Sequence, residues 1–581
     1  MQNPTLDLRN VNSLWASVLV ETLARAGVTR AVVSPGSRST PLTFAFAAHS
    51  EIEAIPVLDE RSAAFFALGL AKLRQQPVVL VCTSGTATAN YLPAIVEASE
   101  SGVPLLVLTA DRPPEMRACA SGQTIDQLKL YGGYVNFFHE LGLPAPSLVA
   151  LRYLRQTVLH ALSRTRMPFA GPVHVNIPFR DPLPPIANPA IATAVKDVDW
   201  ALFFSHIETA TPQLASVAEP LLRPDVHGII VVGPVQPANP DEFVASVAEV
   251  GRRLGWPVLS DGLSPVRNHK ETVPNLVTTY DAVLRNPAVA ERLKPEVVLC
   301  IGDWPTSKVL RTWLQASDAE TWLISSRPGN RDALHGRTRQ VTMEVATLAT
   351  LLPEALDENG YTKMWLRYEE RARTALDAKL EATTHLFEGR VSWMLAKHLP
   401  EDTPLYIASS MPVRDMEYFW PPNTRRIQPH VNRGANGIDG TLSTALGVAH
   451  AAGRPSVLLT GDLALLHDTN GFLLKAKFGG SLTIILINNR GGGIFEHLPV
   501  AQFDPPFEEF FATPQEVDFG RLCSAYEIEH VEVYDWGHFI DYMENLPAHG
   551  MRVLELRTDR KRDAALRKTM LAEVAAAAGS S

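Results

Sequence analysis

The chain alternates short apolar runs with segments whose apolar positions recur every three to four residues. In the first third the apolar runs are 30–34, 54–59, 77–84, 104–111 and 172–178, and one segment with the helical pattern is 62–73. Apolar runs that alternate with amphipathic helical segments are typical of parallel α/β sheets. We therefore predict a doubly wound α/β fold for this part of the chain.

The same alternation continues in a middle region and in a last region that begins near residue 390. The middle region has apolar runs at 226–233, 296–302 and 321–326 and a helical pattern at 241–254. Residues 179–197 contain four prolines and no steady period, which indicates a linker. The polar helical pattern at 361–382 indicates a second connector. We predict three doubly wound parallel-sheet domains, over residues 1–185, 198–355 and 365–581.

Composition narrows the class of protein. The chain has 581 residues, 46% hydrophobic and 20% charged, and a net charge of −9, which argues against an extended nucleic-acid surface. Its four cysteines are scattered without CxxC spacing, so we expect buried free thiols in a reducing compartment rather than a zinc site. The first twelve residues lack the signal-peptide pattern and no apolar run is long enough to cross a bilayer. We expect a cytoplasmic protein.

Two polar side chains follow apolar runs in the last region. Asp462 follows "SVLLTG" and Asn489 closes "LTIILINN", with three glycines at 491–493 behind it. Ligands of open α/β sheets bind just past the carboxyl ends of the strands. A carboxylate, a carboxamide oxygen and loop carbonyls are hard ligands that suit Mg²⁺, and glycines let the backbone approach a diphosphate. Each dipeptide alone is more typical of a turn or a helix cap, but the spacing, the strand context and the glycine run together indicate a Mg²⁺–diphosphate site.

This arrangement resembles the metal–diphosphate signature of thiamine-diphosphate (ThDP) enzymes, in which Gly-Asp-Gly is followed by Asn-Asn. The chain departs from it at the third position, where Leu463 stands. The resemblance implies the cofactors ThDP and Mg²⁺, with Mn²⁺ as an alternative metal. It also implies a pyrimidine-binding first domain, a central domain and a diphosphate-binding last domain.

The ThDP family also needs a glutamate in the first domain, which hydrogen-bonds the aminopyrimidine ring of the cofactor. Glu60, in "VLDERSAAFF", stands at the corresponding place, although an acidic residue there also suits a first helical turn. Ile438, in "NRGANGIDG", resembles the apolar residue that supports the bent cofactor. In this family the glutamate and the diphosphate site meet across a subunit interface, so the resemblance implies a homodimer or a dimer of dimers (a homotetramer).

Several motifs place arginines and small polar residues after predicted strands. These candidates are Ser37, Arg38, Arg112, Gln123, Lys308, Ser410, Arg414 and Arg433. The guanidinium group binds carboxylates through two parallel hydrogen bonds, so several such arginines favour a substrate with several carboxylates. Taken singly, each arginine is more typical of a surface ion pair.

The segments "PGSRSTPLT", "ADRPPE" and "NRGANGIDG", in this order, closely resemble the 2-succinyl-5-enolpyruvyl-6-hydroxy-3-cyclohexene-1-carboxylate (SEPHCHC) synthase family of menaquinone biosynthesis. The resemblance extends from about residue 12 to about residue 560, and leucine after Gly-Asp is common in that family. It implies a transferase that decarboxylates 2-oxoglutarate, releases CO₂ and adds the four-carbon carbanion equivalent to isochorismate in 1,4 fashion.

The resemblance also implies residue roles. The catalytic set is Glu60, Arg38, Gln123, Arg414 and Arg433. The metal set is Asp462, Asn489 and Gly491. The cofactor set is Glu60, Ser410, Ile438, Gly461, Asp462, Leu463, Asn489, Gly491, Gly492 and Ile494. The substrate set is Ser37, Arg38, Arg112, Gln123, Lys308, Ser410, Arg414, Arg433, Phe495 and Leu498, of which Phe495 and Leu498 belong, with Ile494, to an apolar wall.

Two positions depart from the family pattern, and three other interpretations compete with it. Val309 stands where a second basic residue is common in the family, and Ser409 stands where asparagine is common.

The nearest alternative is another ThDP-dependent 2-oxoacid carboligase or decarboxylase of the acetolactate-synthase type. A non-catalytic ligand-binding protein of the same fold is the second, although Glu60, Asp462 and Asn489 are all present. Nucleotide binding by the middle region is the third, but "VVGPVQPANP" lacks GxGxxG, and we expect no FAD.

Overall fold

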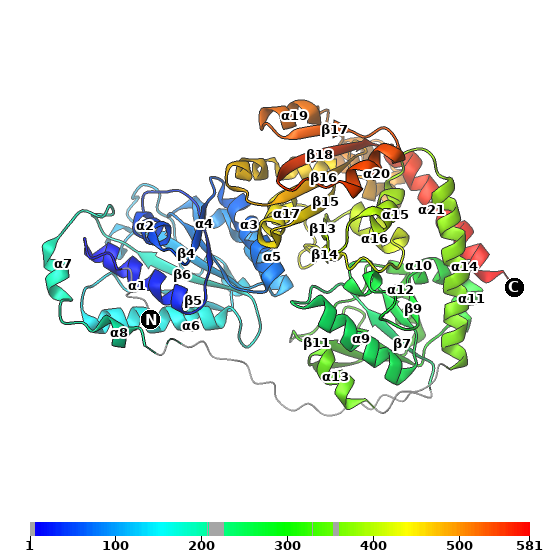
Figure 1. Cartoon of the computed structure of the whole chain (residues 1–581), viewed down its shortest axis with the longest axis horizontal. Coiled ribbons are helices and arrows are strands. Elements are labelled where there is room, and N and C mark those ends of the chain that lie inside the picture. The colour runs from blue at the N-terminus through cyan, green and yellow to red at the C-terminus, as the bar shows by residue number, and fades with distance from the viewer. Residues whose placement is uncertain (1–5, 206, 208–225, 328, 353–358, 581) are drawn as a thin grey trace. The chain divides into compact units, whose positions relative to one another are not determined.

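The computed structural model describes residues 6–205, 207, 226–327, 329–352 and 359–580 (Figure 1). It contains three six-stranded sheets, and all the strand pairings in them are parallel. This confirms the predicted doubly wound α/β fold class. The described residues fall into two compact units. Unit 1 comprises 1–213, 432–451 and 468–479, and unit 2 comprises 214–431, 452–467 and 480–581.

Unit 1 holds the first sheet, whose strand order is β2-β1-β3-β4-β6-β5. Its strands are β1 (Arg30–Val33), β2 (Glu53–Pro56), β3 (Val78–Cys82), β4 (Leu105–Asp111), β5 (Phe137–Glu140) and β6 (Pro172–Pro178). Its helices include α1 (Val11–Arg25), α2 (Thr40–Ala48), α3 (Glu60–Arg74), α4 (Thr86–Asn90), α5 (Leu92–Ser101) and α6 (Leu148–Arg164). The central strands β3, β4 and β6 are buried along their whole length, which explains their continuous apolar runs.

Helix α17 (Thr441–Ala452) also belongs to unit 1, up to Ala451, and packs closely against α3. A Cβ added to Gly69 of α3 would lie 2.1 Å from the carbonyl oxygen of Thr444, and one added to Gly447 would lie 2.2 Å from that of Phe66. Glycine at both positions lets the two helix backbones approach each other. This contact holds the end of the "NRGANGIDG" segment against the helix that begins at Glu60.

The predicted linker 179–197 contains a short helix, α7 (Pro189–Ala194). Asn188 caps it by accepting a hydrogen bond from the backbone N–H of Ala190, and Pro189 occupies the first helical position, where proline is tolerated. A second short helix, α8 (Trp200–Phe203), follows. The proline content therefore marked a helix start here as well as a connecting segment. The predicted domain boundary at residue 355 lies outside the described residues.

Unit 2 holds the other two sheets. The second sheet has the order β12-β11-β10-β7-β8-β9 and the third has the order β14-β13-β15-β16-β18-β17. The strands of the second sheet are β7 (Gly228–Val232), β8 (Val258–Ser260), β9 (Leu276–Val277), β10 (Val297–Ile301), β11 (Glu320–Ser325) and β12 (Arg337–Thr342). Those of the third are β13 (Pro404–Ile407), β14 (Gln428–His430), β15 (Pro455–Gly461), β16 (Ser481–Asn488), β17 (Glu529–Glu532) and β18 (Gly550–Arg557).

The helices of unit 2 surround these sheets. They are α9 (Pro240–Leu254), α10 (Tyr280–Leu284), α11 (Pro287–Arg292), α12 (Lys308–Ser317), α13 (Val345–Leu351), α14 (Gly360–Ala382), α15 (Glu388–His398), α16 (Met411–Phe419), α18 (Asp462–His467), α19 (Phe519–Ala525), α20 (Trp536–Glu544) and α21 (Arg560–Gly579). Among the described residues, none of the helices is both long and apolar enough to cross a membrane.

The predicted connector at 361–382 is the long helix α14, which runs beside α21 (Figure 1). It is more than a connector, because Trp365, Ala372, Leu376 and Leu380 are fully buried. These side chains belong to one continuous apolar core that includes residues of both unit 2 sheets. The two sheets of unit 2 are therefore stabilised together.

Candidate active site

The two polar motifs of the last region meet at the carboxyl edge of the third sheet. Asp462 follows β15 and Asn489 follows β16, and these strands are parallel neighbours in which Gly461 pairs with Ile487. The backbone N–H of Gly491 donates a hydrogen bond to Asp462 Oδ2 over 2.8 Å. The structure thus brings the predicted metal residues together at the edge where ligands of parallel sheets bind.

Asp462 is buried, with 3% of its surface exposed, and is the first residue of α18. Burial raises the pKa of its carboxyl to about 6, although backbone N–H groups, including that of Gly491, act in the opposite direction. Among the described residues no cationic side chain is hydrogen-bonded to this carboxylate, so a bound cation would stabilise it.

Asn489 is buried and its two amide atoms have different surroundings. Its Nδ2 donates a hydrogen bond to Glu388 Oε1 over 2.7 Å. Its Oδ1 is buried without a hydrogen-bond partner among the described residues. Since buried polar atoms are nearly always satisfied, this oxygen is suited to a bound group that the protein itself does not supply.

The loop after Asn489 requires glycine at residue 491. Gly491 has a φ of +131°, and a Cβ there would lie 2.3 Å from the carbonyl oxygen of Ala512. The next residue, Gly492, donates its backbone N–H to the same carbonyl over 2.7 Å. The loop backbone is therefore fixed close to Asp462.

The chemistry of this donor set fits Mg²⁺. One carboxylate, one unsatisfied amide oxygen and backbone carbonyls are oxygen ligands, and Mg²⁺ takes few protein ligands beside phosphate and water oxygens. Over the described ranges of the chain, His, Cys, Asp and Glu side chains nowhere form a group of three or more that could hold a metal ion. That part of the chain therefore has no metal site built from side chains of these types alone.

The remaining cofactor candidates of unit 2 lie around this edge. Gly461 ends β15, and Leu463 is half-buried in α18. Ile494 and Phe495 are half-buried in the short helix η5 (Gly493–His497), whereas Leu498, just after it, is 46% exposed. The predicted apolar wall is thus one contiguous segment whose last member is open to solvent.

Two predicted substrate residues flank the start of α16, after β13. Ser410 has a φ of +82°, and Arg414 Nη1 donates to the Ser410 carbonyl over 2.5 Å. Burial lowers the pKa of Arg414, and the nearby cation Arg311 of α12 contributes to this shift. Lys308, the first residue of α12, is exposed. The first turns of α12 and α16 therefore carry cationic groups that an anion would stabilise.

Unit 1 has a cluster at the carboxyl edge of its own sheet. Arg38 is 7% exposed and its Nη1 donates to the carbonyl of Phe179 over 3.0 Å. Arg112 Nη1 donates to Ser84 Oγ, and Gln123 Nε2 donates to the Ser84 carbonyl over 3.0 Å. Burial, with a contribution from the Arg112 cation, lowers the pKa of Arg38.

The two guanidinium groups of this cluster are incompletely satisfied. Arg38 Nε and Arg112 Nε are both buried without a hydrogen-bond partner within the part of the chain that the structure describes. Ser37, beside Arg38, is exposed. Two neighbouring cations with unused donors form a site for a carboxylate or another anion.

Glu60 is half-buried at the start of α3, and Asp59 caps this helix by accepting hydrogen bonds from the backbone N–H groups of Arg61 and Ser62. Burial raises the pKa of Cys82 to about 12, and the charge of Glu60 adds to this shift. Glu60 is therefore close to the carboxyl end of β3. Arg433 and Ile438 are half-buried in the same unit.

Several residues that hold these side chains were not predicted. Glu388, Asp415 and Arg567 form a buried network behind Asn489, and Ser84 joins Arg112 to Gln123. In unit 1, Glu97 accepts hydrogen bonds from the backbone N–H groups of Gly434 and Ala435 over 3.1 and 2.7 Å, next to Arg433. The only local signal was that Asp415 directly follows Arg414.

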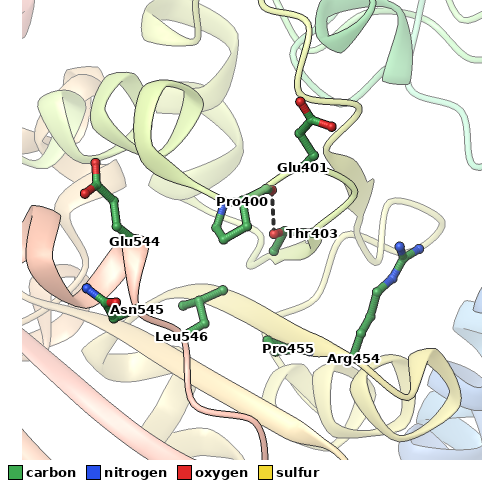
Figure 2. Close-up of a pocket in the computed structure, with 8 residues that line it drawn as sticks. All are labelled: Pro400, Glu401, Thr403, Arg454, Pro455, Glu544, Asn545 and Leu546. Carbon is green, nitrogen blue, oxygen red and sulfur yellow. Dashed lines mark hydrogen bonds between the residues drawn. The ribbon is translucent and has the colours of Figure 1, made fainter.

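A cavity of about 350 Å³ lies at the opposite, amino-terminal edge of the third sheet (Figure 2). Figure 2 shows its lining residues: Pro400, Glu401, Thr403, Arg454, Pro455, Glu544, Asn545 and Leu546. Strands β13 and β15 begin beside it, at Pro404 and Pro455. It contains none of the predicted site residues, and ligands of parallel sheets bind at the other edge.

The chain is similar to known proteins along most of its length. Three family models match: the N-terminal thiamine pyrophosphate (ThDP) binding domain of thiamine pyrophosphate enzymes over residues 15–130, their middle domain over 211–407 and their C-terminal binding domain over 413–574. SEPHCHC synthase from Microcystis aeruginosa is 53% identical, with 96% of this chain and 98% of the relative covered. That from Gloeothece citriformis is 52% identical, with 98% and 99% covered.

Solved structures are similar in fold at much lower identity. Benzoylformate decarboxylase from Polynucleobacter necessarius has a TM-score of 0.66 at 16% identity, with 94% of this chain and 98% of that chain covered. A Mycobacterium smegmatis protein described as thiamin diphosphate-dependent has a TM-score of 0.65, also at 16% identity, with 94% and 99% covered. At this identity the likeness shows the fold alone.

Proposed function

The chain belongs to the SEPHCHC synthase family of ThDP enzymes, and on that premise we propose that it decarboxylates 2-oxoglutarate and adds the remaining four-carbon unit to isochorismate. The products are CO₂ and SEPHCHC, an intermediate of menaquinone biosynthesis. The observation that carries this proposal is the near-full-length identity of 50% or more with several relatives of that name.

ThDP, when bound, supplies the chemistry that stabilises the carbon left after decarboxylation. The chain's own residues hold and orient the cofactor. Asp462, Asn489 Oδ1 and the Gly491 carbonyl are the proposed ligands of a Mg²⁺ ion, which Mn²⁺ can replace. The unsatisfied Asn489 Oδ1 and the uncompensated Asp462 carboxyl support this assignment.

Glu60 is the proposed partner of the aminopyrimidine ring. Its carboxyl would hold a proton at the ring nitrogen N1′ of the cofactor, and Ile438 would support the cofactor's bent form. We further propose that Glu60 of one copy completes the diphosphate site of a second copy, so that the enzyme is a homodimer or a dimer of dimers. Scattered free cysteines support a reducing, cytoplasmic location.

The arginines are the proposed substrate anchors. Arg414, with Ser410 and Arg433, would bind the far carboxylate of 2-oxoglutarate. Arg38, Arg112 and Gln123, with Ser37 and Lys308, would orient isochorismate. The buried Nε donors of Arg38 and Arg112, which have no hydrogen-bond partner among the described residues, support a carboxylate ligand at that edge. Ile494, Phe495 and Leu498 would exclude water, which strengthens the charged contacts.

A substrate comparison tests this proposal against the acetolactate-synthase alternative. The purified protein, loaded with ThDP and Mg²⁺, is given 2-oxoglutarate or pyruvate, each with and without isochorismate, and CO₂ release and adduct formation are measured. We expect turnover with 2-oxoglutarate and an isochorismate adduct by mass spectrometry. Ready decarboxylation of pyruvate with none of 2-oxoglutarate would refute the proposal.

A further inference from the structure

We propose that Glu388 is a positioning residue that sets the orientation of the Asn489 amide, and that Arg567 holds Glu388 in place for this purpose. The proposal rests on the metal site of the proposed function. Glu388 lies in α15 and is not among the residues proposed to contact the cofactor or the substrate.

The contacts of Glu388 define which way the Asn489 amide faces. Glu388 Oε1 accepts from Asn489 Nδ2 over 2.7 Å and from Thr558 Oγ1 over 3.3 Å. An ionised carboxylate only accepts hydrogen bonds, so the amide atom that faces it must be the NH₂ group. Asn489 Oδ1 is therefore turned away from Glu388 and has no partner among the described residues.

Arg567 of α21 holds Glu388 in a fixed position. Its Nη2 donates to Glu388 Oε2 over 3.0 Å, and its Nε and Nη2 donate to the two oxygens of Asp415 over 2.7 and 2.9 Å. All three side chains are at least 95% buried. The one buried cation thus pairs with two buried carboxylates and fixes the position of both.

The same guanidinium group joins three segments of the candidate site. Asp415 directly follows Arg414 in α16, and Arg567 Nη1 lies 3.1 Å from Nε2 of His497, the last residue of η5. Through these contacts Arg567 connects Glu388, and with it Asn489, to the helix of Arg414 and to the segment of Ile494 and Phe495. Removal of a residue that hydrogen-bonds a metal ligand typically lowers the metal affinity by about 10- to 100-fold.

Glutamate and glutamine side chains have the same shape. The variant Glu388→Gln therefore tests the orientation of the Asn489 amide without changing the packing. The glutamine must present an oxygen to the Arg567 N–H groups, so its NH₂ group faces Asn489. The Asn489 amide must then turn over and direct its own NH₂ group to the metal. We expect the Mg²⁺ concentration at half-saturation of ThDP binding to rise by at least about 10-fold.

The measurement is a Mg²⁺ titration of ThDP binding, by calorimetry or quenching of tryptophan fluorescence, without 2-oxoglutarate or isochorismate. The matched control is Glu369→Gln in the same unit, because Glu369 is 8% exposed and accepts four hydrogen bonds from Thr278 and Thr279. We expect an unchanged Mg²⁺ dependence in the control. An unchanged dependence in Glu388→Gln, or the same rise in both variants, would overturn the proposal.

A double variant tests the pair directly. In Asn489→Asp alone, two carboxylates face each other and Mg²⁺ binding should weaken. In Glu388→Gln with Asn489→Asp, the glutamine NH₂ group donates to one carboxylate oxygen and the other oxygen faces the metal. We expect the double variant to bind Mg²⁺ more tightly than either single variant, and no recovery would count against the proposal. Because no substrate is used, this result is independent of whether 2-oxoglutarate is the substrate.

Discussion

The backbone N–H of Gly491 donates to a carboxylate oxygen of Asp462 over 2.8 Å, so the loops after two neighbouring strands are joined by one hydrogen bond. This contact places the oxygen of Asp462, the Asn489 amide and the Gly491 backbone at one edge of the third sheet. The glycine is required there, since both its backbone conformation and its neighbours exclude a side chain.

Gly491→Ala should therefore weaken cofactor binding as well as stability. Its φ of +131° is in a region that only glycine adopts readily, and the added Cβ would approach the Ala512 carbonyl oxygen to 2.3 Å. We expect a loss of stability of about 1–3 kcal/mol from backbone strain alone, and a marked loss of Mg²⁺-dependent ThDP binding. Thermal unfolding and ThDP titration measure the two effects.

Gly453→Ala is the control for this variant. Gly453 also has a positive φ, +63°, but a Cβ there would meet no atom within 4 Å. It should cost less stability and leave ThDP binding unchanged. Equal effects of the two substitutions on ThDP binding would contradict the assigned role of the Gly491 loop.

Arg112→Gln should raise the KM for isochorismate and leave decarboxylation of 2-oxoglutarate alone unchanged. The variant removes a charged donor whose Nε is buried and has no hydrogen-bond partner in the described part of the chain. Hydrogen bonds to charged groups contribute about 1.5–3 kcal/mol, so we expect a rise of roughly 10- to 100-fold. Arg180→Gln, at an exposed ion pair with Glu115 in the same unit, is the control and should change neither parameter. A rise in the KM for 2-oxoglutarate instead would reverse the substrate assignment.

The stability of unit 1 should depend on pH through Asp468. Burial raises the pKa of this carboxyl to about 6, although Ser443 donates both its backbone N–H and its hydroxyl to it. The folded protein therefore binds a proton more tightly than the unfolded chain, and its free energy of unfolding falls as pH rises toward about 6. The fall amounts to about 1.4 kcal/mol for each pH unit between the two pKa values.

Asp468→Asn removes this titration. The difference in Tm between the variant and the wild type should become more positive from pH 5 to pH 7.5, as followed by thermal unfolding. Asp535→Asn, which changes an exposed helix cap, serves as the control for the substitution itself. A Tm difference that stays constant over this range would show that Asp468 does not titrate as described.

Glu60→Gln should remove most turnover and retain much of the affinity for ThDP. Glutamine keeps the shape of the side chain but cannot exchange the proton that the cofactor ring requires. Steady-state assays and ThDP titration separate the two effects. Glu51→Gln, at an exposed position of the same unit, is the control. Full turnover in Glu60→Gln would exclude its assigned role.

The sequence predicted the interior strands well because their residues are apolar on both faces. The runs at 104–111 and 172–178 correspond to β4 and β6 almost residue for residue. Two edge strands were missed: β12 has the sequence RTRQVT and is largely exposed, and β5 is half-buried throughout. Their strand conformation comes from pairing with a neighbour, which leaves no apolar run to detect.

The candidate site was predictable only where its residues follow strands or match a known motif. Asp462 and Asn489 were placed by strand position, and Glu60 by family resemblance. The contact between Glu388 and Asn489 joins residues 101 positions apart, and that between Glu388 and Arg567 joins residues 179 apart. Neither pair has a local pattern, because Glu388 lies in α15, Asn489 directly follows β16 and Arg567 lies in α21.

The central claim is that Glu60 of one chain and the Asp462 loop of another form each catalytic site, and subunit mixing tests it most directly. The variants Glu60→Gln and Asp462→Asn, each inactive alone, are dissociated, mixed in equal amounts and reassociated. If sites are shared between chains, each hybrid dimer contains one intact site, and activity should recover to about a quarter of the wild-type value. No recovery, in a mixture shown to contain hybrid dimers, would contradict the account.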